Sequence, residues 1–293
     1  MKCNKMKKLL GILVLGLLVC NTSFADIEGL DLHIKNSNKE SDIIKLNNRY
    51  MQTCELDLTI EGEYMYMKVI SKINKINKNE FLVNEIIMDL QESGILNMTT
   101  TEKIATDGKV SKTKIKYDYT PGSEYNLKKE LKPLKKLLSD FSNSSKFTND
   151  LYGNRLSPGK KLDKESGKEA MRLLKKNIKS MFPDENPKEM KKFFKEITMN
   201  FYTEYLGTVE INGEKFYVIK EQLVIEHSSN NLELEKEMNE ENVPTFRFIH
   251  AASGYSSGLY IQGDSGVDSY DMTCTIYKDN QELLEVDISE YLN

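Results

Sequence analysis

The chain of 293 residues has no tryptophan, three histidines, four cysteines and six prolines. The histidines His33, His227 and His250 stand singly, without HExxH, Cys-x-x-Cys or an acidic calcium loop, so we expect no metal site. No GxGxxG or Walker-type loop is present, which leaves a nucleotide without a phosphate-binding loop. The absence of tryptophan also removes the clearest sign of a carbohydrate platform. We therefore expect no cofactor.

Long apolar runs are scarce as well. The run from Leu9 to Val19 is shorter than the roughly 20 residues of a membrane-spanning helix. It follows four lysines and precedes the small-x-small site Ser23-Phe24-Ala25, which predicts a bacterial-type export signal over residues 1–25, cleaved after Ala25. The mature chain is then periplasmic or secreted and not integral to a membrane. The alternative is a lipoprotein acylated at Cys20, which the branched Val19 disfavours.

The charge of the mature chain is negative. Loss of the signal removes four lysines and no acid, so 37 basic residues face 45 acidic ones, a net charge of −8. This balance disfavours a general binder of nucleic acid or anionic membranes. Residues 124–200 carry +8 and residues 201–293 carry −13, which favours docking of these parts on each other. A partner surface is the other interpretation of the basic segment, although a solvated lysine-rich helix face is more common.

Two cysteines remain after cleavage, Cys54 and Cys274. Both stand in segments typical of strands, and an even count in an oxidising compartment predicts a disulfide. Such a bond would join the first core strand to one near the C-terminus. Loop-closure entropy suggests about 4 to 5 kcal/mol of stabilisation as an upper value. Two separately buried thiols are the alternative.

The first half of the mature chain predicts β-structure over residues 49–120, after a loose segment at 26–48. Cys54, Leu56, Leu58 and Ile60 alternate with polar residues, as in a strand with one buried side. Further strand-like segments follow at close spacing, separated by polar turns such as Asp107-Gly108. Short connections predict an antiparallel meander.

Residues 124–200 instead show apolar side chains at spacings of three and four. We expect three amphipathic helices here. The first covers about 127–141, the second contains Met171, Leu174, Ile178 and Met181 and ends at Pro183, and the third runs from Pro187 to about Asn200.

A second β region covers residues 201–293. Its strongest signal is Asn212-Gly213, which supplies the positive φ angles of a type I′ hairpin. In all, about eleven strands are expected, in one domain over 49–293. The predicted fold class is α+β: a strongly curved antiparallel sheet or open barrel in two sequence halves, with about three amphipathic helices inserted between them and packed on the sheet.

Two serine motifs suggest a hydrolase. Gly254-Tyr-Ser256-Ser-Gly258 matches the nucleophile elbow, but a strand follows where a helix is required, and no histidine lies downstream. Gly263-Asp-Ser265-Gly266 resembles the nucleophile segment of chymotrypsin-like proteases over four residues only. Both are interpreted as turns. No catalytic residue is assigned, although a serine within hydrogen-bond reach of a histidine would favour a serine hydrolase.

An exported curved sheet with inserted helices resembles, in layout, the lipid and lipoprotein carriers of the LolA and LppX type. The resemblance implies an apolar cavity between sheet and helices, and hence an exported, non-enzymatic envelope protein that binds a lipid-like ligand. Ordinary core packing is the other interpretation of the residues that would line the cavity. A structural or protein-interaction component of the envelope, without a small ligand, is the alternative function. The candidate lining residues are Met171, Leu174, Met190, Phe193 and Phe194.

Overall fold

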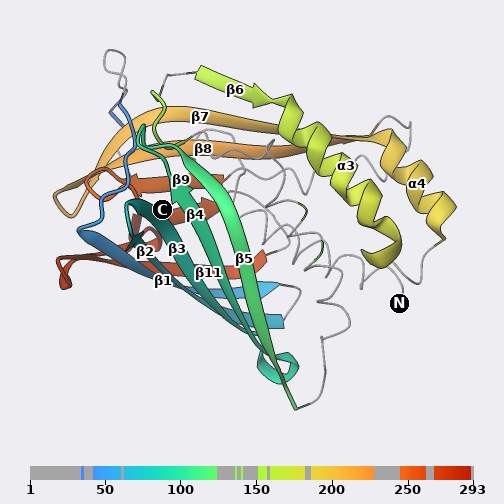
Figure 1. Cartoon of the computed structure of the whole chain (residues 1–293), viewed down its shortest axis with the longest axis horizontal. Coiled ribbons are helices and arrows are strands. Elements are labelled where there is room, and N and C mark those ends of the chain that lie inside the picture. Colours follow the sequence, from blue (N-terminus) through green and yellow to red (C-terminus); the bar gives the residue numbers. More distant parts are fainter. Residues whose placement is uncertain are drawn as a thin grey trace.

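The structure, a computed structural model, describes residues 34–35, 42–60, 63–123, 136, 140, 151–156, 159–181, 186–227, 245–261 and 267–291. These residues form two antiparallel sheets of seven and five strands. Figure 1 shows the sheets close together at one end of the molecule and diverging toward the side on which the helices lie. The shared end therefore holds the core that joins them.

The seven-stranded sheet has the order β12-β11-β1-β2-β3-β4-β5. Its strands are β1 (Tyr50–Ile60), β2 (Glu63–Ile76), β3 (Asn79–Asp89), β4 (Gly94–Ile104), β5 (Val110–Pro121), β11 (Val267–Lys278) and β12 (Gln281–Asp287), with the short helix η1 (Gln91–Ser93) between β3 and β4 and η2 (Ser289–Tyr291) after β12. The predicted meander is present from β1 to β5. β1 also pairs on its other side with β11, so the first strand lies inside the sheet.

The five-stranded sheet has the order β10-β9-β8-β7-β6. Its strands are β6 (Gly159–Asp163), β7 (Ile197–Ile211), β8 (Glu214–His227), β9 (Thr245–His250) and β10 (Ser256–Ile261). The turn predicted at Asn212-Gly213 joins β7 to β8, with φ angles of 51° and 82°. Positive φ at both residues matches a type I′ turn, whose twist fits the flanking strands. The hairpin prediction is confirmed.

Two helices, α3 (Lys164–Met181) and α4 (Pro187–Glu196), follow β6. The side chain of Asp163 accepts a hydrogen bond from the backbone N–H of Ser166 at 2.9 Å and caps α3, and Asn186 caps α4 in the same way. A Cβ atom at Gly167 would lie 1.9 Å from the carbonyl oxygen of Met199. The first turn of α3 therefore approaches β7 as closely as glycine allows, beyond the stretch of β7 that pairs with β6.

The packed core joins the two sheets. Its aromatic residues from the five-stranded sheet, Phe216, Phe246 and Phe248, are fully buried. They pack with side chains from β1, β3, β11 and β12 of the other sheet. The complete packed core consists of Tyr50, Leu82, Val209, Ile211, Phe216, Val218, Phe246, Phe248, Tyr255, Ile276, Leu284, Val286 and Ile288.

The predicted fold class is wrong. The described chain is mostly antiparallel β-structure in two sheets that do not close as a barrel, and it contains two helices where three were expected on one curved sheet. Residues 159–163 pair with β7, and residues 197–200 belong to β7, although both segments fall in the region assigned to helices. Helical spacing in residues 124–200 carries no information about strand partners that lie far away in sequence, and pairing with β7 prevails.

Several predictions lie outside the described residues. These are the signal over 1–25 with its cleavage site, most of the loose segment at 26–48, and the first helix over 127–141 apart from Lys136 and Asp140, which are helical. Where the structure is described, no helix has both the length and the apolar character needed to cross a membrane.

Candidate functional site

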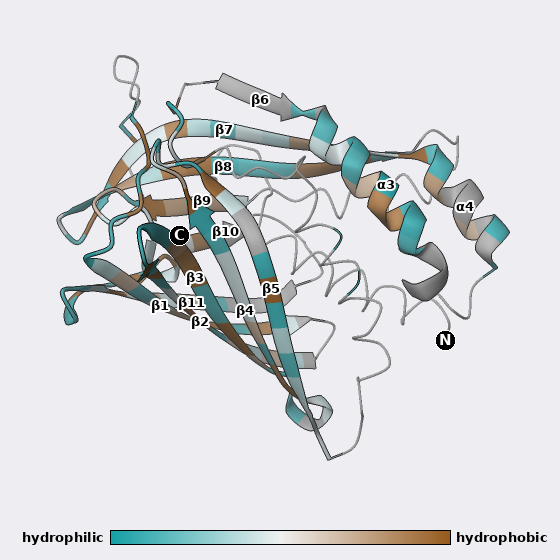
Figure 2. Cartoon of the chain, in the orientation of Figure 1, coloured by the Kyte–Doolittle hydropathy of each residue, from teal (hydrophilic) through white to brown (hydrophobic). Residues whose placement is uncertain are grey.

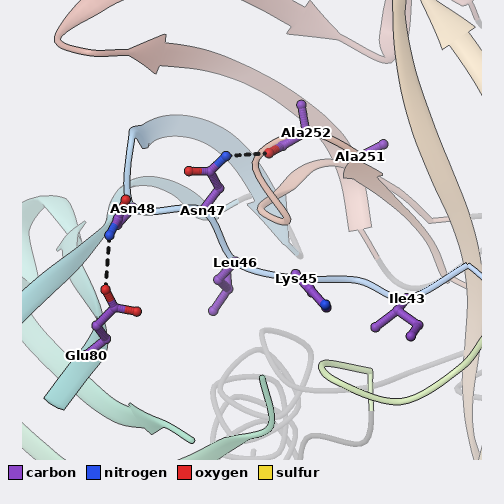
Figure 3. Close-up of a pocket in the computed structure, with 8 residues that line it drawn as sticks. All are labelled: Ile43, Lys45, Leu46, Asn47, Asn48, Glu80, Ala251 and Ala252. Atoms are coloured by element: carbon purple, nitrogen blue, oxygen red, sulfur yellow. Dashed lines mark hydrogen bonds between the residues drawn. The ribbon is translucent and has the colours of Figure 1, made fainter. Parts of the chain in front are cut away.

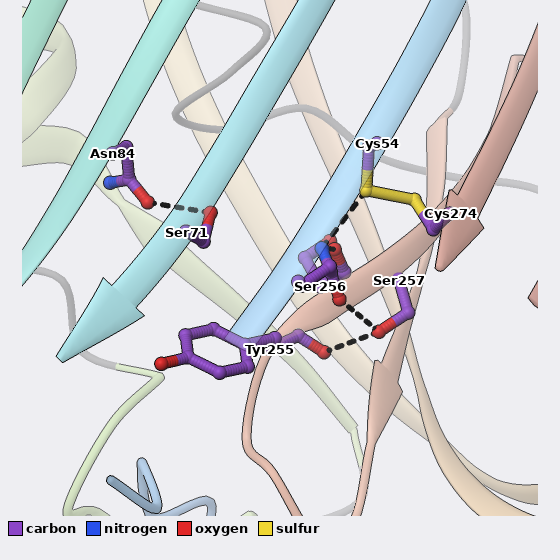
Figure 4. Close-up of a disulfide and its surroundings, with 8 residues drawn as sticks. Cys54, Ser71, Asn84, Tyr255, Ser256, Ser257 and Cys274 are labelled. Atoms are coloured by element: carbon purple, nitrogen blue, oxygen red, sulfur yellow. Dashed lines mark hydrogen bonds between the residues drawn. A yellow bond between two sulfur atoms is a disulfide. The ribbon is translucent and has the colours of Figure 1, made fainter. Parts of the chain in front are cut away.

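The two mature cysteines lie directly opposite each other on neighbouring strands. Cys54 of β1 is in register with Cys274 of β11, and their sulfur atoms are 2.05 Å apart, the distance of a disulfide (Figure 4). Both side chains are buried. The pair connects positions 220 residues apart in the sequence, so it ties the start of the sheet to its end.

A row of polar residues crosses the inner face of the seven-stranded sheet beside this disulfide. Gln52, Ser71, Asn84 and Thr100 are consecutive partners in the register of β1 to β4 and form the polar row. Ser71 Oγ donates to Asn84 Oδ1 at 2.8 Å (Figure 4). Asn84 Nδ2 in turn donates to Thr100 Oγ1 at 3.1 Å. Ser71, Asn84 and Thr100 therefore form a hydrogen-bonded chain across β2, β3 and β4.

Gln52 ends this row at the other sheet. Its amide nitrogen donates to the carbonyl oxygen of Ser256, and its amide oxygen accepts from Ser257 Oγ. Gln52 and Ser257 are both buried, so these bonds satisfy polar groups away from water. The polar row thus begins where β10 meets β1 and runs out across β2, β3 and β4.

Beyond the polar row, toward the β3–β4 turn, the same face is apolar. In one row Leu56, Met67, Met88, Leu96 and Tyr119 are consecutive partners from β1 to β5. Some of these side chains, such as Met67 and Leu96, are buried, and others, such as Met88, are half-buried. We call this surface the inner apolar face, and it consists of Leu56, Leu58, Met65, Met67, Val69, Ile86, Met88, Leu96, Met98, Tyr117, Tyr119 and Met272.

The outer face of the same strands is charged. Lys72 and Glu85 form an ion pair at 2.7 Å, and Lys68 pairs with Glu55. By contrast, none of the described side chains on the inner face of β1 to β5 and β11, from the polar row toward the β3–β4 turn, carries a charge. Figure 2 shows the resulting hydrophilic and hydrophobic bands along these strands. In this part of the sheet the described charged side chains therefore lie on the outer face, which also carries exposed apolar residues, and the described inner side chains are uncharged.

The lining residues predicted from the sequence lie elsewhere, on α3 and α4. Met171, Leu174, Met190 and Phe194 are buried, and the side chain of Phe193 is outside the described ones. The two helices contact each other and β7. Burial of these side chains is what packing of amphipathic helices requires, so a role in lining a cavity stays a prediction.

An open pocket of about 330 Å³ lies at the opposite end, where the segment before β1 meets the β9–β10 turn (Figure 3). Polar groups dominate it: Asn48 Nδ2 donates to Glu80 Oε1 at 3.0 Å, and Asn47 Nδ2 donates to the carbonyl oxygen of Ala252 at 3.3 Å. Its position and polarity do not match the apolar cavity expected between sheet and helices.

The structure places a serine beside a histidine, but not one of the predicted serines. His250 Nδ1 lies 3.0 Å from Ser253 Oγ, and its Nε2 lies 3.3 Å from Glu214 Oε2. Ser253 and His250 are both fully buried, and Ser253 Oγ also accepts from the backbone N–H of Tyr255. Burial lowers the pKa of His250, and Glu214 partly opposes this shift. The group closes the β9–β10 turn and presents no hydroxyl to a substrate.

The two serine motifs behave differently from a nucleophile elbow. Ser256 starts strand β10, and its carbonyl oxygen accepts from Gln52. Ser265 lies outside the described residues, as does His33. Within the described part of the chain, Ser256 therefore has no histidine partner.

A charged cluster is buried between the sheets. Arg247 pairs with Glu221 at 2.7 Å. The charge of Arg247 lowers the pKa of Tyr152, whereas Glu221 and the buried Glu102 raise it. Burial raises the pKa of Tyr152 to about 12. This cluster was missed at the sequence level, together with the polar row. A signal exists for both, because Glu221, Gln52, Ser71 and Asn84 each interrupt an alternating apolar series in their strands.

Comparison with known proteins assigns no family. No protein-family model and no curated protein matches the chain. A solved structure from Bacteroides fragilis, described as an exported protein with a YmcC-like fold, aligns over 84% of this chain and 96% of its own, with 9% identity and a TM-score of 0.25. A DUF1329 family protein from Desulfovibrio piger aligns over 80% and 81%, with 8% identity and a TM-score of 0.19. Likeness at this level establishes neither fold nor function.

Proposed function

We propose that this chain is an exported envelope protein that binds, without catalysis, an apolar, lipid-like ligand on the inner apolar face of its seven-stranded sheet. The observation that carries the proposal is an inner surface of methionine, leucine and tyrosine side chains, several of them half-buried, whose described members are uncharged, in a sheet whose outer face is charged. A cleaved export signal, expected from residues 1–25, would deliver the chain to the compartment in which such ligands occur.

Side-chain chemistry supports binding on this face. Methionine is unbranched and polarisable, so it adapts to ligands of varied shape better than branched residues do. Met65, Met67, Met88, Met98 and Met272 all lie on the inner apolar face. Covering a further 100 Å² or so of apolar surface contributes about 2.5 kcal/mol, against the cost of ordering the ligand.

The first test is native mass spectrometry of the protein purified from its envelope without detergent. We expect a bound mass in the range of a lipid, released by organic solvent. A stoichiometric second polypeptide and no small ligand would contradict the proposal. It would favour an interaction protein, the alternative that the outer face supports, because Tyr64, Ile87 and Ile95 there are 43%, 37% and 40% exposed.

The second test uses neighbouring positions of β4 that point to opposite faces. Met98→Lys puts a charge on the inner apolar face, whereas Asn97→Lys adds the same charge to the exposed outer face. We expect Met98→Lys to weaken binding of a fluorescent acyl probe at least about tenfold, and Asn97→Lys to leave it within about twofold. Thermal melting checks that both variants fold, and Met98→Leu should retain binding. Equal affinities of the two lysine variants would contradict the proposed site.

A further inference from the structure

The polar row has hydrogen-bonding capacity left over. In the chain from Ser71 to Thr100, Asn84 uses one of its two amide N–H groups, and Thr100 acts as the acceptor. One N–H of Asn84 and the hydroxyl hydrogen of Thr100 therefore remain as donors. Both side chains are half-buried and border the inner apolar face, so a ligand lying on that face meets two donors at its inner end.

This end of the face is unsuited to an anion. On the inner face, no cationic side chain is present among the described residues from the polar row toward the β3–β4 turn. The next residue on the same side of β4 is the buried Glu102, an acidic side chain that supplies no positive charge to a carboxylate. Arg247, the cation described in the nearby cluster, already pairs with Glu221. An ionised group moved here from water would lose its hydration without gaining a counter-ion from the described residues of this face.

For an uncharged hydrogen-bond acceptor, the hydrogen bonds gained here can offset the loss of hydration. An ester carbonyl needs one or two donors and no counter-ion, and both donors are available beside the apolar surface that an acyl chain would cover. A neutral carbonyl paired in this way loses little on leaving water, and the chain attached to it gains burial.

We propose, resting on the function proposed above, that the ligand is an acyl-glycerol ester whose carbonyl accepts hydrogen bonds from Asn84 and Thr100, and that the polar row selects esters over free fatty acids. The selectivity arises from donors without a cation. The polar row is thus a specificity element of the site, separate from the apolar surface that supplies most of the affinity.

The test compares monolaurin with laurate, which share one acyl chain, by calorimetric titration at a pH where laurate is ionised. We expect monolaurin to bind at least about tenfold more tightly. Equal or tighter binding of laurate would overturn this inference and leave the proposed function intact. Failure of both to bind would instead overturn the proposed function.

Variants of β4 assign the selectivity to the row. Thr100→Val removes a donor and should reduce the preference for monolaurin about three- to tenfold, while Thr99→Val on the outer face should leave it unchanged. Thr100→Lys supplies the missing cation and should shift the preference toward laurate, with Thr99→Lys as its control. Melting curves establish folding of each variant. If neither Thr100 variant changes the preference, the polar row is not the specificity element.

Discussion

Two regions of the same interior are built differently. The packed core at the shared end of the sheets relies on phenylalanine, isoleucine and valine, and Phe216, Phe246 and Phe248 have no exposed surface. The inner apolar face relies on methionine, leucine and tyrosine, and side chains such as Met65, Met88 and Met98 stay half-buried. The hydrogen-bonded polar row separates the two.

The difference supports a division in which the packed core serves stability and the inner apolar face serves the proposed binding. Stiff, branched and aromatic side chains at full burial define one packing arrangement. Flexible methionines at partial burial leave apolar contacts unmade, which a ligand can complete. The packed core should therefore be sensitive to substitution, and the inner apolar face should tolerate it.

The largest effect should come from truncation in the packed core. Phe248→Ala removes a fully buried ring from β9 and should lower the free energy of unfolding by about 3 to 5 kcal/mol. Met88→Ala on the inner apolar face should cost about 1 kcal/mol, because part of that side chain already contacts water. Urea denaturation of the two variants measures both values. Similar losses would remove the distinction between the regions.

The disulfide lies at the boundary between the regions, and its loss should affect both. Cys54→Ser with Cys274→Ser opens a loop of 220 residues and should lower the free energy of unfolding by about 2 to 4 kcal/mol. Denaturation of the native protein with and without a reductant provides a second measurement. A variant as stable as the native protein would show that the strand pairing alone holds β1 to β11.

Acidic pH should lower the stability of the folded protein through protonation of His250 beside the packed core. Its pKa is lowered in the folded protein from an ordinary value of 6.5, mainly by burial. The unfolded chain therefore takes up the proton first, so stability is complete above about pH 6.5 and falls as the pH drops below it, by at most about 1.4 kcal/mol per pH unit.

His250→Gln should remove this part of the acid sensitivity, as measured by chemical denaturation across the acidic range. Glu214→Gln removes the carboxylate that supports the protonated ring, and should make the acid loss steeper. An unchanged profile in His250→Gln would assign the acid sensitivity to other groups.

The smallest effect should come from the outer face. Lys72→Ala breaks the ion pair with Glu85, in which the side chain of Lys72 is 35% exposed and that of Glu85 is 42% exposed. The substitution should change the free energy of unfolding by no more than about 0.5 kcal/mol. Added salt should reduce the difference further. A loss comparable with that of Met88→Ala would mean that the outer face also carries stability.

Local signals in the sequence predicted local structure well. The Asn212-Gly213 hairpin, the meander from β1 to β5 and the start of α4 at Pro187 all depend on residues within a few positions of each other. The fold class failed because it depends on distant partners. β6 (Gly159–Asp163) is a strand because it pairs with β7, about forty residues later in the sequence. The pattern within its own five residues does not predict this pairing.

The candidate site could likewise be predicted from the sequence only where its features depend on neighbouring residues. Alternation of apolar and polar residues in β1 identified one buried side, but not which buried residues stay partly open. The residues predicted to line a cavity were chosen for helical spacing, and that spacing is shared by ordinary core positions such as Met171 and Leu174. The polar row needs the register of four strands before Gln52, Ser71, Asn84 and Thr100 become one feature.

Because β1 lies between β2 and β11, the pairing of β1 is completed only after β11 has been synthesised. During synthesis β1 is made early, yet its second neighbour is made about 200 residues later. Until β11 has been synthesised, one edge of β1 has unpaired backbone N–H and C=O groups. Another chain can form a strand against this edge. Chains truncated before β11 should therefore aggregate rather than persist as smaller domains, and this edge of β1 needs protection by a chaperone until synthesis is finished.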